Sequence, residues 1–444
     1  MSRNLLYHGV ILRTGAGFLL ARSNYWGGYR RAASVWSFGD NSNGALGISS
    51  PLLDAYEPAK VPELPATITA VTSGHYHSLA VNADGEVWAW GRNNEGQLGR
   101  GADAPRSTWC KPERVLGLNN VKVKSAYASG VVSAVIGDDG SLWVWGRSKR
   151  GQLGLGKRVM EAIMPSKVEA LSGQEISKVS FGWGHVLALT RDSKLFGWGY
   201  AENGRLGKMV EVSLSSSPQF SNSYGSLDSS VPLLKIEEEP VAEKSMEKFM
   251  PINWEPTLIS ELSSIDVSDV ACGFDHSLIL CYDGTVLSSG DNTYGQLGRD
   301  TDGSKVLPVH INFRPLSLSA GLGHSLLLCR MPSNGGSFLD EATGILSWGW
   351  NKSSQLGRKG RENVPAPVEG LEGEEMVSVS AGRVHSICLT SKGQVWTWGS
   401  GRNGRLGLGS FADEAEPTFV QYLEGFVVLQ AVTGFDHNLL LVAD

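Results

Sequence analysis

The chain has 444 residues, 41% of them hydrophobic and 19% charged, with a formal net charge of −6. This composition is typical of a globular protein, and the longest apolar run is far shorter than the roughly 20 residues of a membrane-spanning helix. The cysteines are odd in number and lack Cys-x-x-Cys spacing, so the sequence indicates neither a disulfide framework nor a zinc site.

The first 34 residues differ in composition from the rest of the chain. They contain five arginines, interleaved with apolar residues, but no lysine, aspartate or glutamate. A cationic segment able to form an amphipathic helix is typical of an organellar transit peptide, so residues 1–34 are predicted to be one. A disordered tail and a nucleic-acid-binding arm are the alternatives. Removal of this segment would change the net charge from −6 to −11, which leaves an acidic body.

A tryptophan-rich segment then recurs seven times and is clearest at residues 87–99. The first glycine of each copy lies at Gly39, Gly91, Gly146, Gly199, Gly290, Gly349 and Gly399. Successive glycines are 50 to 59 residues apart, except for one interval of 91 residues that indicates an insertion. A repeat at this period predicts a single closed array of small β units, not several separate domains.

Each repeat contains the pattern of about four strands. In the clearest copy, two strands flank the Asp84-Gly85 turn, which is typical of a hairpin, and a Pro-x-x-Val segment adds an outer strand. The chain begins this pattern with a lone tryptophan-rich strand at residue 35 and ends with the missing half, residues 432–441. We therefore predict an all-β fold, a seven-bladed β-propeller over residues 35–444 whose last blade combines N- and C-terminal strands.

Two sets of repeated side chains are predicted to be structural. Tryptophans at i and i+2 share one face of a strand, so they are expected to pack between blades: Trp88, Trp90, Trp143, Trp145, Trp396 and Trp398. An aromatic ligand or chromophore cluster is the alternative. Histidines that recur at the blade period cannot converge on one metal, so we expect them to bond to neighbouring backbone groups: His77, His185, His276, His324, His385 and His437.

Two segments interrupt the repeats. Residues 208–256 are rich in serine, glutamate and lysine with little apolar periodicity, which predicts a flexible surface insertion. Residues 331–343 replace a tight hairpin turn with a segment rich in proline, glycine and serine. Blade packing is expected to be weakest at residues 287–290, where both large aromatic residues of the repeat are missing.

The loops after the tryptophan-rich strands are expected to lie on one face of the ring and to carry a net positive charge. Their candidate partner-binding residues are Arg92, Arg147, Lys149, Arg150, Arg205, Arg402 and Arg405. On an acidic protein, such a face is suited to RNA or to an acidic protein surface, although a solvated charged rim is the alternative.

No catalytic motif, metal site or cofactor site is recognisable, and the Gly399–Gly404 match to a dinucleotide motif precedes no helix pattern. We therefore expect a protein that is not an enzyme.

The three repeated motifs, Gly-x-x-His-Ser-Leu, Asp-Gly-x-Val-Trp-x-Trp-Gly and Asn-x-x-Gly-x-Leu-Gly, resemble the regulator of chromosome condensation repeat, and they cover nearly all of residues 35–444. Members of that family act in nucleotide exchange on a Ran GTPase, chromatin binding, ultraviolet-B sensing and scaffolding. The ultraviolet-sensing branch carries repeated Gly-Trp-Arg-His-Thr segments, whereas here only Trp183 has the tryptophan and Gly184 follows it. This departure argues against photoreception.

The arginine-rich leader makes the chain most similar to the plant mitochondrial members of the group. That resemblance implies a mitochondrial matrix protein that supports organellar RNA processing, including intron splicing of a complex I subunit transcript, and thereby complex I biogenesis. It implies a protein or ribonucleoprotein partner on the loop face, with RNA contact as an open question and no membrane span. The alternative is a guanine nucleotide exchange factor for a Ran-like or organellar small GTPase.

Overall fold

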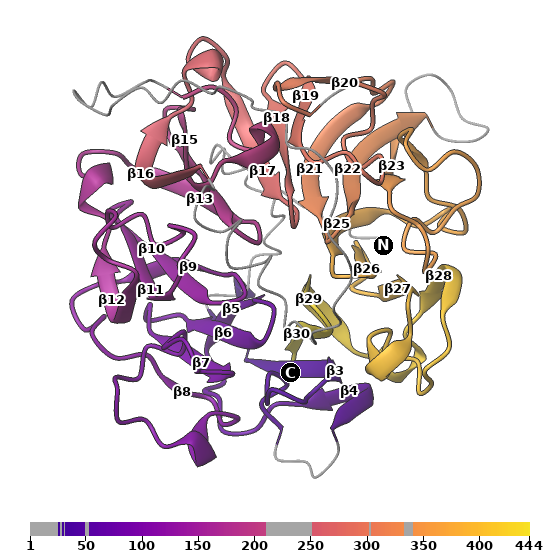
Figure 1. The fold of residues 1–444 in the computed structure, drawn as a ribbon. Helices are drawn as coiled ribbons and strands as arrows, with labels where there is room; N and C mark the ends of the chain where they lie inside the picture. Colours follow the sequence, from indigo (N-terminus) through magenta and orange to yellow (C-terminus); the bar gives the residue numbers. More distant parts are fainter. Residues whose placement is uncertain are drawn as a thin grey trace, which may run out of the picture.

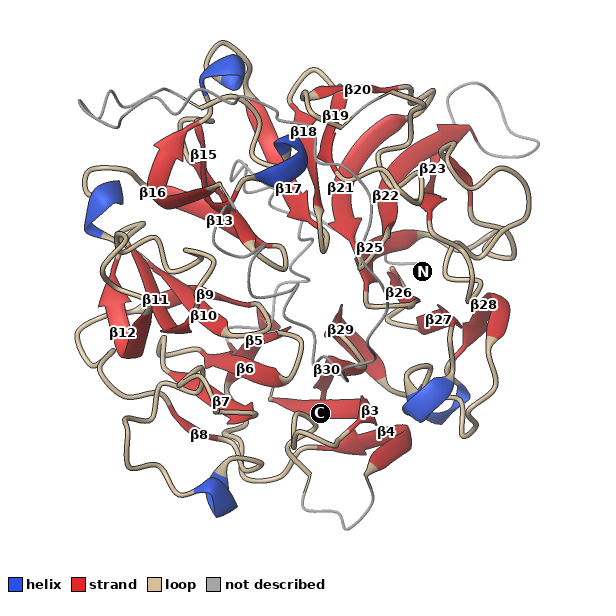
Figure 2. Cartoon of the chain, viewed as in Figure 1, coloured by secondary structure: helices blue, strands red, loops and turns tan. Residues whose placement is uncertain are grey.

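The fold is a closed ring of seven four-stranded antiparallel sheets around a central axis (Figure 1). The structure is a computed structural model that describes residues 25–26, 29–30, 32–48, 53–209, 251–301, 303–332 and 341–444. This architecture confirms the predicted seven-bladed β-propeller. Strands dominate it, and the short 3-10 helices lie in connections between strands (Figure 2): η1 (Arg106–Thr108), η2 (Glu169–Leu171), η3 (Glu202–Gly204), η5 (Ser260–Leu262), η6 (Arg402–Gly404) and η7 (Gln421–Leu423).

Six sheets are each formed by four strands that are consecutive in the chain. In each of them the first strand lies nearest the axis and the fourth lies at the outside (Figure 1). The first three consist of β5 (Ile68–Ser73), β6 (His77–Asn82), β7 (Val87–Gly91) and β8 (Glu113–Arg114); β9 (Val123–Ala128), β10 (Val132–Gly137), β11 (Leu142–Arg147) and β12 (Glu161–Lys167); and β13 (Ile176–Phe181), β14 (His185–Thr190), β15 (Leu195–Tyr200) and β16 (Ile252–Leu258). The next three consist of β17 (Val267–Cys272), β18 (His276–Cys281), β19 (Val286–Gly290) and β20 (Leu307–Val309); β21 (Arg314–Ala320), β22 (His324–Pro332), β23 (Glu341–Gly349) and β24 (Ala366–Pro367); and β25 (Met376–Ala381), β26 (His385–Thr390), β27 (Val395–Gly399) and β28 (Glu414–Phe419).

The seventh sheet joins the two ends of the chain, as predicted. Strands β29 (Val427–Thr433) and β30 (His437–Ala443) pair with β3 (Ala33–Asp40) and β4 (Asp54–Lys60), which brings indigo and yellow segments together in Figure 1. Strand β3 begins at Ala33, two residues before the predicted start of the propeller, and Ser34 donates a hydrogen bond to the Asp444 carboxylate at 2.7 Å. A separate two-stranded ribbon precedes it, β1 (Tyr25–Trp26) with β2 (Tyr29–Arg30).

Two kinds of connection meet on one face of the ring, which we call the loop face. The inner turn joins the first and second strands of a sheet, and the outer loop joins the third and fourth. In the first sheet they are adjacent, since Arg92 N–H donates to the Tyr76 carbonyl at 2.9 Å. Gly91 begins the outer loop with φ 108°, and a Cβ there would lie 2.6 Å from that same carbonyl. The close approach of inner turn and outer loop explains why the repeat begins with glycine.

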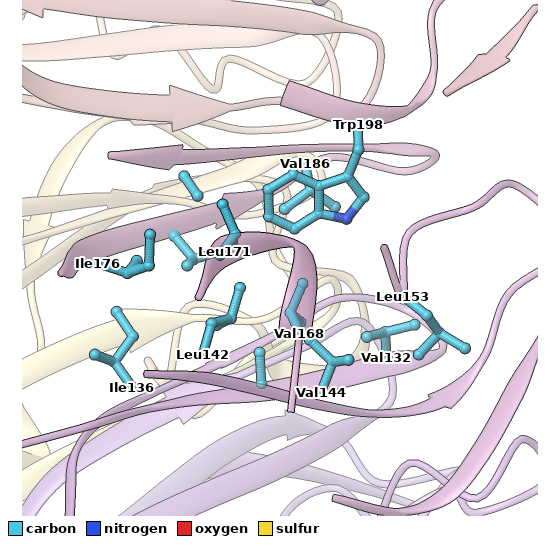
Figure 3. Close-up of a cluster of buried hydrophobic side chains, with 13 residues drawn as sticks. Val132, Ile136, Leu142, Val144, Leu153, Val168, Leu171, Ile176, Val186 and Trp198 are labelled. Atoms are coloured by element: carbon cyan, nitrogen blue, oxygen red, sulfur yellow. The ribbon is translucent and has the colours of Figure 1, made fainter. Parts of the chain in front are cut away.

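Apolar side chains fill the seams between neighbouring sheets. The cluster between the β9–β12 and β13–β16 sheets includes Val132, Val186 and Trp198 (Figure 3). The second tryptophan of each pair, Trp90, Trp145 or Trp398, is fully buried in such a seam, and Trp88, Trp143 and Trp396 pack partly buried beside the same clusters. All six of these tryptophans therefore lie at seams between sheets.

The two insertions are only partly within the described residues. Met209 forms a β-bridge with Ile259, and β16 already begins at Ile252, so the ends of the predicted insertion 208–256 belong to the sheet. Residues 210–250, on which the prediction of flexibility depends, lie outside the described part. In the second insertion, Met331 pairs with Ala342 and Pro332 with Glu341, which lengthens the β22–β23 hairpin.

Candidate functional site

The repeated histidines form hydrogen bonds between sheets. Each imidazole Nε2 lies 2.7–3.1 Å from a polar side chain of the next sheet, in the pairs His77–Ser133, His185–Ser277, His276–Ser325, His324–Ser386, His385–Asn438 and His437–Ser78. Each of those serines in turn donates to a backbone carbonyl of the outer loop in the sheet before it, as Ser133 does to Gln97 at 2.8 Å. The histidines therefore join neighbouring sheets, and their Nε2 partners are side-chain hydroxyl groups or one amide oxygen, not the backbone groups that we expected from the sequence.

This geometry determines the histidine tautomer. Because the Ser133 hydroxyl hydrogen is used on the Gln97 carbonyl, the His77 Nε2 must carry the hydrogen of the inter-sheet bond. The partner of His385 is the Asn438 amide oxygen, which can only accept. Nδ1 of His77 is buried without a partner among the described residues, and the same holds for His185, His276, His324 and His385. Protonation would place an N–H there with no acceptor.

Burial accordingly lowers the pKa of every histidine in this set. The pKa falls to about 3 for His77, His324 and His385 and to about 4 for His276 and His437, and that of His185 is also well below its usual value. Desolvation is the largest cause in each case. The imidazoles are neutral at physiological pH, and they act as hydrogen-bond donors within the seams instead of as acids or bases.

One seam lacks the histidine-serine pair. Val132 stands in the histidine position of the β9–β12 sheet, and Val186 stands in the serine position of the next sheet. Both are fully buried in the same apolar cluster (Figure 3). Replacement of both polar partners by apolar groups leaves no buried donor unsatisfied, so this seam can dispense with the hydrogen bond.

Two of the predicted partner-binding residues lie inside the ring. The Arg205 side chain is 2% exposed and forms an ion pair with Asp275, and the Arg405 side chain is 6% exposed and forms an ion pair with Asp436 at 2.7 Å. Each of these pairs links an outer loop to an inner turn in the next sheet. Their guanidinium groups are not offered to a partner, so we assign both arginines a structural role in place of the predicted binding role.

Three further arginines stabilise outer loops from within. Arg100, Arg299 and Arg358 each follow a Gln-Leu-Gly segment, and their guanidinium groups donate to backbone carbonyls of their own loop. Arg358, for example, reaches the carbonyls of Ser347 and Val364 at 2.8 and 2.7 Å. The sequence analysis did not single out these three arginines, although the repeated Gln-Leu-Gly-Arg pattern was a signal for a shared structural role.

The other predicted residues lie on the loop face. Arg147 and Lys149 are exposed at the start of the β11–β12 loop, followed in the same loop by exposed Lys157 and Arg158. Within the described residues, none of these four side chains takes part in an ion pair, although Arg147 lies opposite Glu161 in the strand register. We call this group the cationic loop.

Two of the three remaining arginines, Arg92 and Arg402, have different surroundings. Arg92 is neutralised by Glu95 of its own loop, with 2.6 Å between Nη2 and Oε1, and also lies over the Tyr76 ring. Arg402 is exposed in η6, on the far side of the ring from the cationic loop (Figure 1). Among the predicted residues, only Arg147 and Lys149 are exposed cations of one and the same loop, and the β23–β24 loop carries a further exposed set, Lys352, Lys359 and Arg361.

Aromatic rings from four inner turns gather at the axis on the loop face. His75 stacks on Phe435 with ring centroids 4.6 Å apart, and Trp183 stacks on Phe274 at 4.9 Å. His75 and Phe274 link the two pairs, at 6.3 Å and an interplanar angle of 12°. We call these four half-buried rings the axial ladder. Sequence reasoning missed it, although each ring directly follows the inner-turn glycine.

An arginine lies at each end of the axial ladder. Arg150 of the β11–β12 loop places its guanidinium 3.4 Å from the centroid of Trp183, and Arg383 lies 4.9 Å from that of Phe435. The arginine that the sequence lacks directly after Trp183 is thus supplied by the neighbouring sheet. Gly184 makes room for it, because a Cβ there would lie 2.9 Å from the Arg150 Cδ.

The axial ladder borders a cavity of about 120 Å³, lined also by the inner-turn glycines. This is smaller than the roughly 300–1,000 Å³ typical of small-molecule sites, so it favours a single flat group over a whole cofactor.

Within the described ranges, His, Cys, Asp and Glu side chains do not gather in threes as a metal site would require. No helix in the described part of the chain has the length and apolar character to cross a membrane.

Comparison with known proteins places this geometry in a family. The profile of the RCC1-like domain matches residues 34–440, nearly the whole ring. The chain belongs to the RCC1-like domain family. Among solved structures, the RCC1-like propeller is similar to Prp20p from Saccharomyces cerevisiae, with a TM-score of 0.73 and 21% identity over 94% of this chain and 92% of that one. Human WBSCR16 gives a TM-score of 0.72 with 20% identity, covering 93% of this chain and 100% of that chain. At these identities the likeness concerns the fold alone.

Similar sequences in the RCC1-like family have different names and roles. The ultraviolet-B receptor UVR8 of Arabidopsis thaliana is 28% identical over 88% of this chain and 78% of its own length. A secretion-regulating guanine nucleotide exchange factor of Mus musculus is 30% identical over 68% of this chain and 62% of its own length. The human regulator of chromosome condensation is 26% identical over 92% and 90% of the two chains. Family membership therefore does not select one function.

Proposed function

We propose that this RCC1-like propeller is a non-enzymatic mitochondrial scaffold for organellar RNA processing. Its role would be to support intron splicing of a complex I subunit transcript, and thereby complex I biogenesis, by holding a protein or ribonucleoprotein partner on the loop face. The cationic loop carries this proposal, because it concentrates exposed positive charge on a protein whose net charge is −6. A cationic sector on an acidic protein orients an anionic partner toward one face.

The arginine-rich leader supports the location. Ala33 and Ser34 pair with Ala443 and Val442 in the closing sheet, so import processing N-terminal to Ala32 would leave the ring intact. The test is import of the full chain into isolated mitochondria, followed by mass spectrometry of the mature N-terminus. Failure of import, or a mature chain that keeps the arginine-rich leader, would contradict this part of the proposal.

Cells that lack the protein test the role itself. Reverse-transcription PCR across each mitochondrial intron should show unspliced precursor for a complex I subunit, and the full-length chain should restore splicing. The variant Arg147→Glu/Lys149→Glu should restore it poorly. Lys122→Glu/Lys124→Glu is the matched control. It makes the same charge change at the start of β9, which is the end of that strand away from the loop face. Normal splicing in the absence of the protein would end the proposal.

Nucleotide exchange on a small GTPase is the second candidate. It is favoured by the 30% identity with the mouse exchange factor and by the fold shared with Prp20p, whose structure is described together with its binding to Gsp1p. The measurement is release of a fluorescent guanine nucleotide from a Ran-like GTPase and from mitochondrial GTPases. Faster release on addition of the full chain would favour exchange, whereas unchanged release together with captured intron RNA or splicing proteins would favour the scaffold.

A further inference from the structure

Exposed aromatic side chains lie where the closing sheet meets the β25–β28 sheet. Tyr56 belongs to β4, Phe411 to the loop between β27 and β28, and Tyr422 to η7. Their exposed fractions are 36%, 76% and 48%. Strand β4 contacts both η7 and η6, which is part of the β27–β28 loop. Three segments from the two ends of the chain therefore bring these aromatic residues to one region of the outer rim (Figure 1).

Gly409 holds this group of side chains together. Its N–H donates to the Tyr56 carbonyl at 2.9 Å, and a Cβ at this position would lie 2.7 Å from the Tyr422 hydroxyl oxygen. Its φ of 78° lies in the left-handed region, so glycine suits both requirements. Phe411 follows two residues later, and two residues span at most about 7 Å. The three aromatic side chains therefore form one surface, which we call the rim patch.

The rings of the rim patch have open faces. A phenylalanine with 76% of its surface exposed, as Phe411 has, cannot have both ring faces covered. Phe411, Tyr56 and Tyr422 form neither a ring stack nor a cation–π contact with any residue that the structure describes. The axial ladder differs in this respect, because its rings cover one another. An open ring face can accept a cation.

Carboxylates surround the rim patch. The Tyr422 hydroxyl donates a hydrogen bond to Glu57, and this bond raises the pKa of the tyrosine. The chain continues from Phe411 into Asp413 and Glu414. Glu57 and Asp413 are exposed. Negative charge therefore lies on both segments that carry the aromatic side chains.

The cations near the rim patch offset this charge only in part. Lys60 and Arg405 are each engaged in an ion pair, whereas Arg402 is exposed in η6. Burial, followed by the repulsion of Asp40, raises the pKa of Asp54 at the start of β4. A cationic partner would therefore relieve repulsion among these carboxylates.

We propose that the rim patch binds a basic peptide segment of a partner protein, with one arginine side chain stacked on Phe411 and another paired with Glu57. Arginine suits both contacts, because its planar guanidinium stacks on aromatic rings and forms paired hydrogen bonds with a carboxylate. An RNA backbone or an anionic lipid surface would be repelled by the same carboxylates. The inference goes beyond the proposed function, since η6 and the rim patch lie on the far side of the ring from the cationic loop (Figure 1).

One binding experiment separates the aromatic contact from the charged one. The probe is a peptide of repeated Arg-Gly-Gly units with an uncharged fluorescent label, and its anisotropy is measured with the full-length chain at low and at high salt. Phe411→Ala should weaken binding roughly 2- to 30-fold, the range expected for a cation–π contact. Glu57→Gln should weaken it roughly 1.5- to 5-fold at low salt and less at high salt, as for an exposed ion pair.

Matched controls separate binding from folding and from net charge. Phe411→Tyr retains a ring and should retain most of the affinity, whereas Phe411→Leu should behave like the alanine variant. Tyr282→Ala removes an aromatic residue that is 57% exposed beside Asp283 in the β18–β19 turn, away from the rim patch, and it should bind like the unaltered chain. A Lys-Gly-Gly peptide of the same length should bind more weakly, because an ammonium group is not planar. The melting temperature of each variant reports whether the ring is intact.

Several results would overturn the proposal. They are undetectable binding of the arginine peptide at low salt, equal affinity of Phe411→Ala and the unaltered chain, and equal affinity for the lysine peptide, which would indicate attraction by charge alone. A second copy of the chain is the other occupant that the variants test. If sedimentation shows a dimer that Phe411→Ala converts to a monomer, the patch is a contact between copies and the proposal is wrong. Slower hydrogen exchange in residues 408–413 on addition of the arginine peptide would support it.

This inference and the proposed function can fail separately. If the arginine peptide does not bind but cells without the protein accumulate unspliced transcript, the scaffold stands and the rim patch has no such partner. If the peptide binds at Phe411 but every intron is spliced in the absence of the protein, the inference stands and the proposed function falls.

Discussion

Six seams of the ring are polar and one is apolar. In the polar seams a neutral imidazole donates to a serine hydroxyl or, once, to an asparagine oxygen, whereas in the seventh Val132 and Val186 occupy these two positions within one apolar cluster. The ring closes equally well with either solution. The comparison shows that the seam requires matched partners more than a hydrogen bond, since a buried donor is costly only when its acceptor is missing.

The outer loops also accept either a polar or an apolar residue at one repeated position. The position after the Leu-Gly segment is arginine in three loops, where the guanidinium satisfies loop carbonyls, as Arg358 does. At the same position Leu155 and Leu408 pack against apolar clusters instead. The repeat therefore tolerates a polar or an apolar solution at one site, provided that the surroundings change with it.

Low pH should have the largest effect on the stability of the protein, because it favours protonation of the histidines in the six polar seams. The unfolded histidines have a pKa near 6.5, and the folded ones about 3 to 4, so the unfolded chain binds more protons. Stability is fully present above pH 6.5 and is lost as the pH falls from there toward 4. The urea midpoint, measured at successive pH values, should fall steeply over this window. A flat profile down to pH 4 would contradict the neutral imidazole assignment, and the exposed His310→Gln variant should leave the profile unchanged.

Arg358→Leu should cost about 3 kcal/mol of unfolding free energy. The substitution supplies the leucine of other loops without their apolar surroundings, and it leaves the Ser347 and Val364 carbonyls without their charged donor. Arg358→Lys should recover little, because a single ammonium cannot reach several carbonyls at once. Hydrogen exchange should be faster in residues 359–365 than in the unaltered chain. Full stability of the leucine variant would show that the arginine is dispensable.

A double-mutant cycle tests the matched-partner idea in one seam. Ser386→Val should cost about 2 kcal/mol, because the His324 Nε2–H loses its acceptor in a fully buried site. Adding His324→Val reproduces the valine pair of the apolar seam and should recover about 1–2 kcal/mol of that loss. Urea unfolding of the four proteins gives the coupling energy. Strict additivity of the two single changes would refute the interpretation.

The smallest expected effect concerns the seam with the missing aromatic residues. Ser289 occupies a tryptophan position, and its buried hydroxyl has no partner among the described residues. Ser289→Ala should therefore stabilise the protein by about 0.5–1 kcal/mol. Ser277→Ala, the same substitution in the opposite strand, should destabilise it, because the Ser277 hydroxyl connects His185 to the Arg205 carbonyl. Thermal unfolding of the two variants should shift in opposite directions.

Much of the candidate site was not predictable from the sequence for a definite reason. Arg205 and Arg405 are charged residues in loop positions, which is typical of the surface. Their burial depends on ion pairs with the inner-turn residues Asp275 and Asp436, which are about 30 to 70 positions away in the chain. The axial ladder joins rings from four repeats that are more than 350 residues apart at the extremes. Long-range contacts of this kind leave no periodic signal in the chain.

The sequence by itself determined the ring. Repeated strands with turn glycines, and half a unit at each end of the chain, permit only a closed propeller, because local backbone geometry and period-two burial act within each repeat. The tertiary structure alone decided which charged residues face solvent, which histidine tautomer is present, and where Arg150 meets Trp183. Those features depend on contacts between sheets, and in a closed ring such contacts are set by neighbours in space, not by neighbours in the chain.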